Sequence, residues 1–365
     1  MKTKVAFVLP SLAGGGAERV MLHLAGALDR GRFDPVLVLL NGEGELASAV
    51  PDDIPCITLG TDRLRHALSA LTAALRDIRP DTVISTMGYL NLAILAFVKP
   101  RLPGGIRYLV REANMPEATL AAFPFGPLGR ALGRFAYRLL YRRADRVICN
   151  SRTVADRLKL LGIDETRIAL LDNPVDVAGL RGRVDFQEPR PPGRHFIAAG
   201  RMTHQKGFDL LIPWFASLAA DCRLTILGDG PMRGALERLR TEHGLTDRID
   251  MPGFDTAPWR AIAQADAFLM PSRWEGMPNA ALEALALGTP VIAARTAGGL
   301  PELSADVPAG SLFIVDGEQD FIAAMQSVPK RPERDWQRPS ALPARFEEAE
   351  VVRRYARLIA GDDQP

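Results

Sequence analysis

Two glutamates, Glu275 and Glu283, stand eight positions apart around the start of a predicted helix. The short apolar segment 266–270 ends before Pro271, which predicts a buried strand that runs into a loop. Glu275 lies in that loop. Pro278 favours the first position of a helix, where the N–H that proline lacks is not needed. The spacing therefore places both carboxylates at one end of the helix.

This helix start suits an anion. Its first backbone N–H groups belong to Asn279 and Ala280, and they would face out of the strand ends together with the positive end of the helix dipole. Glu283, one turn further on, would bond a hydroxyl beside the anion. Anion and polyol together indicate a nucleotide sugar. The alternative is a surface loop with two solvated glutamates, against which Gly276 and the ordered strand 290–292 argue.

Two cations, Arg201 and Lys206, lie in the loop between a predicted strand at 196–199 and a helix that begins near Asp209. Fixed cations in the first strand-to-helix loop of a sheet are well placed to neutralise a diphosphate. Solvated surface cations are the alternative, which the position after a buried strand disfavours. Because ligands of open parallel sheets collect outside the carboxyl ends of the strands, we expect the glycine-containing turns of this half to converge there, at Gly200, Gly228, Gly230 and Gly253.

The first half opens with a strand at 5–9, the glycine run Gly14 to Gly16 and a helix, followed by a second strand at 33–40. This order predicts a β-α-β unit with a parallel sheet. The glycines let backbone N–H groups approach a ligand. A dinucleotide-binding fingerprint, and with it a dehydrogenase, is the alternative; however, Arg19 stands where the third glycine would be.

Charged and amide side chains follow a predicted strand at 107–110, namely Arg111, Glu112 and Asn114. By the same sheet rule, they would line the ligand side of the first sheet. A local ion pair between Arg111 and Glu112 is the alternative.

Residues 118–144 contain five arginines and no acidic residue. On a helix over 126–143, an arginine stripe flanked by Tyr137 and Tyr141 lies opposite an apolar face. The stripe consists of Arg130, Arg134, Arg138 and Arg142, and the apolar face of Leu128, Leu132, Phe135 and Leu139. Arginine with tyrosine suits phosphate groups at a membrane surface, including a lipid diphosphate. The alternative is an amphipathic helix whose apolar face packs on its own domain.

The chain of 365 residues, 47% hydrophobic and 24% charged, is long enough for two globular domains. We predict a first domain at 1–176, a linker rich in Arg, Pro and Gly at 177–194, a second domain at 195–345 and a final helix at 346–365. A net charge of +2 argues against a dedicated nucleic-acid binder.

The three cysteines, Cys56, Cys149 and Cys222, have no metal-ligand spacing and are typical of a reduced cytoplasmic protein. The longest apolar run, 89–98, is too short to cross a bilayer, so any membrane contact is expected to be peripheral, on the inner face of the cell membrane.

Three segments carry a resemblance to a known family. The two glutamates eight positions apart, followed by the run ALALGTPVI (284–292), resemble the donor site of retaining glycosyltransferases with the GT-B fold. The segment GRMTHQKGFDLL (200–211) is similar to the same family, and GGGAER (14–19) resembles the opening of bacterial enzymes that extend lipid-linked glycans. The resemblance covers nearly the whole chain and is strongest in the second half.

The resemblance implies an α/β GT-B fold, in which two Rossmann-like, doubly wound parallel-sheet domains face a central cleft and the final helix crosses back to the first domain. It implies transfer of a sugar from a nucleotide-diphosphate donor, with a UDP-sugar expected, to a polyprenyl-diphosphate-linked saccharide. Arg201 and Lys206 would stabilise the departing diphosphate, Glu275 would hold sugar hydroxyls and Glu283 the ribose. The implied donor-binding residues are Gly15, Gly16, Gly200, Gly228, Gly230, Gly253, Gly276, Met277, Pro278, Asn279, Ala280 and Glu283.

In retaining members of the family, the acceptor attacks the face that the diphosphate leaves, so no protein nucleophile is required. No strict D-x-D motif is present, and neither a catalytic metal nor a cofactor is expected. Met277 and Pro278 stand where many relatives have an aromatic residue followed by glycine, a departure that bears on the choice of donor sugar. A sugar-nucleotide epimerase of the same shape and a non-catalytic, membrane-docking protein that binds nucleotide sugar are the alternatives.

Overall fold

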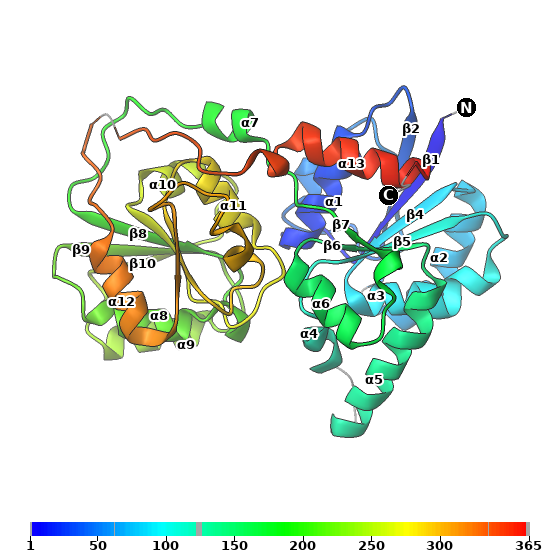
Figure 1. Ribbon diagram of the computed structural model, residues 1–365, viewed down its shortest axis with the longest axis horizontal. Coiled ribbons are helices and arrows are strands. Elements are labelled where there is room, and N and C mark those ends of the chain that lie inside the picture. The colour runs from blue at the N-terminus through cyan, green and yellow to red at the C-terminus, as the bar shows by residue number, and fades with distance from the viewer. Residues whose placement is uncertain (1, 62, 122–125, 335, 363–365) are drawn as a thin grey trace. The chain divides into compact units, whose positions relative to one another are not determined.

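The computed structural model describes residues 2–61, 63–121, 126–334 and 336–362 (Figure 1). The chain divides into two compact units. The first contains the chain up to Pro174 together with the segment from Ala349, and the second is Val175–Glu348. Each unit is built on one parallel sheet covered by helices, so the prediction of two parallel-sheet α/β units is confirmed.

The first unit contains a seven-stranded sheet in the order β3-β2-β1-β4-β5-β6-β7. Strand order reverses between β1 and β4, and the loops that follow these two strands lie at the switch point where such sheets bind ligands. The strands are β1 (Thr3–Leu9), β2 (Phe33–Leu39), β3 (Cys56–Thr58), β4 (Thr82–Thr86), β5 (Arg107–Glu112), β6 (Arg146–Cys149) and β7 (Ile168–Leu170).

Apolar side chains cover both faces of this sheet. Along β1, Ala6 and Val8 belong to one buried cluster, whereas Phe7 and Leu9 belong to the other, because successive side chains of a strand point to opposite faces. The helices of the unit are α1 (Gly16–Ala27), α2 (Leu64–Ile78), α3 (Gly88–Ala93), the π-helix Ile94–Val98, α4 (Pro116–Ala121), α5 (Gly126–Leu140), α6 (Arg152–Leu160) and α13 (Glu348–Ala360), with short 3-10 turns at Ala47–Ala49, Lys99–Arg101, Tyr141–Arg143 and Glu165–Arg167.

The final helix, α13, packs on the first unit (Figure 1, red). Val351 and Tyr355 are fully buried in the same cluster as Phe7. The Arg107 guanidinium donates to the carbonyl of Leu358 at 2.9 Å. Apolar burial and capping of its last carbonyls therefore hold this helix in place.

The second unit contains a six-stranded parallel sheet in the order β10-β9-β8-β11-β12-β13, with its switch point between β8 and β11. Its strands are β8 (Arg194–Ala199), β9 (Cys222–Leu227), β10 (Ile249–Gly253), β11 (Ala267–Met270), β12 (Val291–Ala294) and β13 (Leu312–Val315). Its helices are α7 (Val177–Gly182), α8 (Phe208–Ala216), α9 (Arg233–Glu242), α10 (Trp259–Gln264), α11 (Asn279–Ala286) and α12 (Gly317–Ser327), with 3-10 turns at His204–Lys206, Leu300–Leu303 and Ala344–Phe346.

The segment predicted as a linker is part of the second unit. It contains α7, and its Arg190 is fully buried against Asp266, which immediately precedes β11. The Asp266 carboxylate accepts hydrogen bonds from the Arg190 guanidinium at 3.1 and 3.2 Å and from the backbone N–H groups of His195 at 2.8 Å and Arg331 at 2.5 Å. Residues 177–194, predicted as a linker, are thus held within the second unit by a buried charge pair. Local composition does not show this pair, because the partner of Arg190 lies over seventy positions away in the sequence.

Within the described residues, no helix is both long and apolar enough to span a bilayer.

Candidate active site

The loops that follow the carboxyl ends of β8 to β12 are joined to one another. Backbone hydrogen bonds of 2.6–2.8 Å connect Gly228 to Gly253, Met202 to Asp229, Arg273 to Gln205 and Gly299 to Gly276. The structure thus brings together the glycine turns that the sequence predicted at this edge of the second sheet.

Two glycines make this close approach possible. A Cβ at Gly228 would lie 2.1 Å from the carbonyl oxygen of Gly200, and one at Gly298 would lie 2.2 Å from that of Gly276. Their φ angles of +126° and +70° also disfavour other residues. Any side chain at either position would force the loops apart, so these glycines serve loop packing as well as the predicted ligand approach.

Lys206 and Glu275 form an ion pair among these loops. The Lys206 Nζ lies 2.7 Å from Glu275 Oε1, and the side chains are 19% and 9% exposed. Gln205 Nε2 donates to Glu275 Oε2 at 3.2 Å and to the carbonyl of Trp274 at 3.0 Å. Both carboxylate oxygens are therefore engaged, and the ammonium is held where it is only partly hydrated. Sequence reasoning proposed both charged residues but missed Gln205, whose position beside Lys206 in the same loop was the available signal.

Other predicted donor residues of the second unit lie in the same two loops as Lys206 and Glu275 or in the helix that follows Glu275. Arg201 is exposed in the loop after β8, and Glu283 is half-buried on α11. Pro278 precedes α11 by one residue, so the helix begins at Asn279 rather than at the proline. Met277 is 5% exposed and packs in the apolar core, and its predicted contact with a donor stays a prediction.

The glycine run of the first unit lies against two carboxylates. A Cβ at Gly15 would lie 2.1 Å from Glu18 Oε2, and one at Gly14 would lie 2.2 Å from Glu45 Oε2. Glu18 is 5% exposed and stands in the first turn of α1. These carboxylates were missed by sequence reasoning. The donor contact of Gly15 and Gly16, which lie in the unit that does not contain Lys206, stays a prediction.

Arg111 and Glu112 are buried, with 1% and 2% exposure, and have different partners. Arg111 Nη2 donates to Asn173 Oδ1 at 2.6 Å, whereas Glu112 accepts from Tyr137 at 3.3 Å and from Tyr141. Neighbouring residues of β5 point to opposite faces of the sheet, so the two side chains bind different partners instead of each other. Their predicted contact with an acceptor stays a prediction.

Asn114 lies just after β5 and is half-buried, and its Oδ1 accepts from the N–H of Met115 at 2.8 Å. Its predicted contact with an acceptor stays a prediction.

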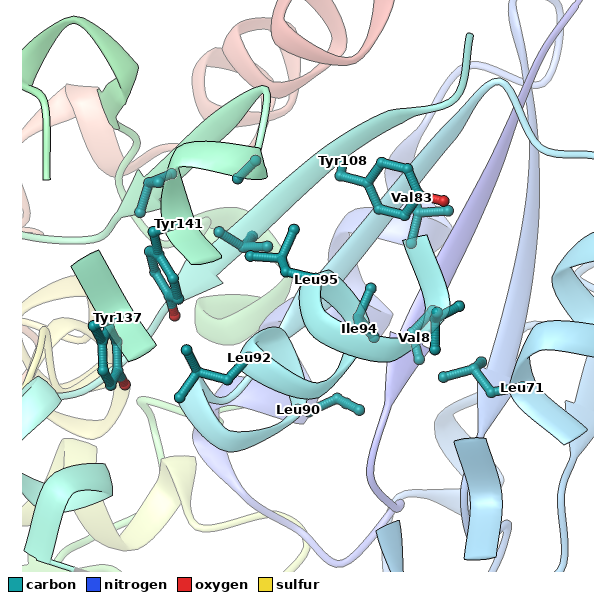
Figure 2. Packing of buried hydrophobic residues seen from close by; sticks show 14 of the residues in the cluster. Val8, Leu71, Val83, Leu90, Leu92, Ile94, Leu95, Tyr108, Tyr137 and Tyr141 are labelled. Carbon is teal, nitrogen blue, oxygen red and sulfur yellow. The ribbon is translucent and has the colours of Figure 1, made fainter. Parts of the chain in front are cut away.

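The buried face of helix α5 differs from the one that the sequence predicted. Gly129, Gly133 and Tyr137 are buried, and Figure 2 shows the Tyr137 and Tyr141 rings beside each other, with centroids 4.8 Å apart. The tyrosines therefore do not share a surface with the arginines. Gly129 and Gly133 are buried and carry no side chain on the face of α5 that meets the core. Both tyrosine hydroxyls donate to the buried carboxyl of Glu112, a contact that periodicity cannot reveal.

The apolar face of α5 is exposed. The packing of this face on its own domain, which was the alternative reading of the helix, is wrong. The exposed fractions are 65% for Leu128, 56% for Leu132, 63% for Phe135 and 46% for Leu139. The four stripe arginines, Arg130, Arg134, Arg138 and Arg142, are exposed as well.

Comparison with known proteins decides the family. Residues 184–341 match the family model described as "Glycosyl transferases group 1", and residues 14–178 match "Glycosyltransferase Family 4". A GDP-mannose-dependent alpha-(1-6)-phosphatidylinositol dimannoside mannosyltransferase of Mycobacterium tuberculosis is 32% identical over 276 residues, which are 64% of this chain and 70% of that protein. The chain belongs to the glycosyltransferases.

This glycosyltransferase has further relatives of similar length. It is 25% identical over 334 residues, 89% of this chain and 90% of the relative, to the N-acetylgalactosamine-N,N'-diacetylbacillosaminyl-diphospho-undecaprenol 4-alpha-N-acetylgalactosaminyltransferase of Campylobacter jejuni. The crystal structure of Anabaena Alr3699/HepE in complex with UDP-glucose matches with a TM-score of 0.79 and 17% identity, over 98% of this chain and 99% of that one. The fold of the glycosyltransferase is therefore GT-B.

Proposed function

We propose that the protein transfers a hexosyl group, with retention of anomeric configuration, from a nucleoside diphosphate donor to a hydroxyl of a polyprenyl-diphosphate-linked saccharide. The observation that carries the proposal is the Lys206–Glu275 pair, held within joined loops at the carboxyl edge of the second sheet, just before α11 begins. Cation, carboxylate and helix start are the three groups that a sugar diphosphate requires.

The proposed reaction needs charge stabilisation rather than a protein nucleophile. The bond between the anomeric carbon and the diphosphate oxygen breaks, and its electron pair stays on the diphosphate. The acceptor oxygen bonds to the same face of the sugar, and its proton passes to the departing diphosphate oxygen. Lys206 and Arg201 stabilise the growing negative charge, while Glu275 exchanges its bonds to Lys206 and Gln205 for sugar hydroxyls.

Metal independence is part of the proposal, because Lys206 and Arg201 supply the positive charge that a divalent cation would otherwise bring. Among the described residues, no cluster of three or more His, Cys, Asp or Glu side chains is suited to a metal ion. An assay with and without a chelator tests this part directly.

A transfer assay tests the function as a whole. Purified protein is incubated with UDP- and GDP-sugars, with and without a polyprenyl-diphosphate-linked disaccharide, and the lipid product is identified by mass spectrometry. Both nucleotides are included because the Anabaena neighbour was crystallised with UDP-glucose, whereas the Mycobacterium tuberculosis relative is GDP-mannose-dependent by name. We expect nucleoside diphosphate to be released only when acceptor is present, and NMR of the product to show a retained anomeric configuration. Interconversion of nucleotide sugars without acceptor would instead identify an epimerase, and binding without turnover a non-catalytic protein.

We further propose that α5 places the enzyme on the inner face of the cell membrane as a peripheral protein. Its exposed residues include four large apolar side chains and three arginines, Arg130, Arg134 and Arg138, without an acidic residue in the helix. The exposed Arg142 follows in the next turn. The amino-terminal part of α5 also extends beyond the other helices of the first unit (Figure 1). Burial of each large apolar side chain contributes roughly 1.5–3 kcal/mol, and each arginine near an anionic surface adds about 1 kcal/mol.

Vesicle sedimentation tests this contact. Leu132→Gln combined with Phe135→Gln is expected to lower binding to vesicles of phosphatidylcholine and phosphatidylglycerol at least about 10-fold, because the apolar term is lost at every salt concentration. Arg134→Gln combined with Arg138→Gln should weaken binding mainly at low salt. Leu160→Gln, at a 78% exposed leucine outside α5, is the matched control. Unchanged sedimentation of the Leu132/Phe135 variant would contradict the proposal.

A further inference from the structure

The turn after β4 has a backbone conformation that its sequence does not favour. Met87 has φ 74° and ψ 119°, values that are uncommon for a residue with a side chain. It connects β4 to α3 at the switch point of the first sheet, where ligands bind in this type of fold. Such a conformation persists only where surrounding contacts hold it, and it points to a functional role.

Polar side chains from neighbouring helices and from β5 lie against this turn. A Cβ at Gly88, the residue after Met87, would lie 2.1 Å from the Tyr137 hydroxyl, 2.7 Å from the Thr119 hydroxyl and 3.0 Å from Glu112 Oε1. The turn therefore rests directly on this cluster, and the absence of a side chain at Gly88 allows the approach.

The same polar groups continue along α3. Asn91 Nδ2 donates to the Tyr141 hydroxyl at 3.3 Å and to the carbonyl of Arg111 at 3.0 Å, while Asn91 Oδ1 accepts from Ser85 Oγ at 2.7 Å. The network lies inside the apolar core of the unit, where unsatisfied polar groups are costly. Its members come from β4, α3, β5, α4, α5 and the turn after α5, and both tyrosine hydroxyls donate to the carboxyl of Glu112.

We propose that Glu112 is a positioning residue, whose buried carboxyl ties α5 to the Met87–Gly88 turn and so holds the acceptor-side edge of the first sheet. The assignment of this edge to the acceptor rests on the proposed function. Tyr89, the next residue, is 43% exposed and is thereby presented at this edge. Because the opposite side of α5 carries the exposed apolar face, the network also joins the proposed membrane contact to this edge.

The protonation state of Glu112 provides a distinctive signature. Burial raises the pKa of Glu112 to about 7, against the hydrogen bonds from Tyr141, Asn91 and Tyr137 and the positive charge of Arg111, and the Cys149 thiol also faces it. A carboxyl whose pKa is raised on folding stabilises the fold at low pH. Its contribution is full below the ordinary value of 4.5 and is lost as the pH rises to about 7.

Hydrogen exchange and kinetics test the inference together. Tyr141→Phe removes the hydroxyl that donates to Glu112 and accepts from Asn91. The variant is expected to speed amide exchange at 88–91, relative to β1, and to raise the acceptor KM, each about 10-fold. The donor KM should not change. Glu112→Gln, neutral at every pH, should flatten the decline in stability between pH 4.5 and 7. Leu71→Ala, in the same apolar core but outside the network, is the control for general destabilisation.

Two outcomes would overturn the inference. One is an exchange ratio at 88–91 in Tyr141→Phe that matches the Leu71→Ala control. The other is a pH dependence of stability that Glu112→Gln leaves intact. Neither readout requires turnover, so failure of the transfer assay and failure of this inference are distinguishable.

Discussion

Replacing Lys206 with methionine is expected to lower kcat by about 10²- to 10³-fold, the usual loss when one preorganised group that stabilises a developing anion is removed. Methionine keeps much of the aliphatic stem, which lies across Gly200, but removes the ammonium that pairs with Glu275 at 2.7 Å. Because the diphosphate gains charge as it leaves, the effect should fall on kcat more than on the donor KM. Steady-state kinetics with saturating acceptor measure both parameters.

The matched control is Lys159→Met, since Lys159 forms an ion pair of the same length, 2.7 Å, with Glu165 on an exposed surface of the first unit. Its kcat should stay within about twofold of the wild-type value, because exposed pairs contribute little. A Lys206→Met enzyme with a normal kcat would refute the role given to this residue, and with it the main support for the proposed function.

Replacing Asp266 with asparagine is expected to lower the free energy of unfolding of the second unit by about 3–5 kcal/mol. The carboxylate is fully buried and receives the Arg190 guanidinium together with the backbone N–H groups of His195 and Arg331. Loss of its charge would leave Arg190 buried without its counterion, and the Arg331 guanidinium, whose pKa burial already lowers to about 9, would lose the same negative charge. The NH₂ group of the asparagine would also face the N–H groups that now donate to the carboxylate, so that donor would meet donor.

Tryptophan fluorescence in denaturant isolates this effect, because all four tryptophans, Trp214, Trp259, Trp274 and Trp336, lie in the second unit. Asp316→Asn is the control, since Asp316 pairs with Arg295 at 2.8 Å but both side chains are about 60% exposed. That variant should cost less than about 1 kcal/mol. Equal unfolding midpoints for the two variants would show that the buried cluster does not anchor the unit.

Local sequence information was sufficient for the sheets and for the edge where the site lies. Short apolar runs bounded by glycine and proline predict strands, and the alternation with helices predicts parallel pairing and hence a ligand edge. Lys206 and Glu275 were found because both lie in the loops that follow such strands. Local patterns did not show that the two side chains bind each other, or that Gln205 donates to the second oxygen of the Glu275 carboxylate.

The amino-acid sequence by itself determined the order of elements, the glycine turns and the amphipathic character of α5, because these depend on neighbours within a few positions. Tertiary structure alone decided which face of α5 meets the core, that Glu112 lies beneath two tyrosines, and that Arg190 anchors the supposed linker on Asp266. Periodicity reveals the two faces of a helix, but it does not show which face packs against the rest of the protein. That choice depends on packing and on buried charges brought together from distant parts of the chain.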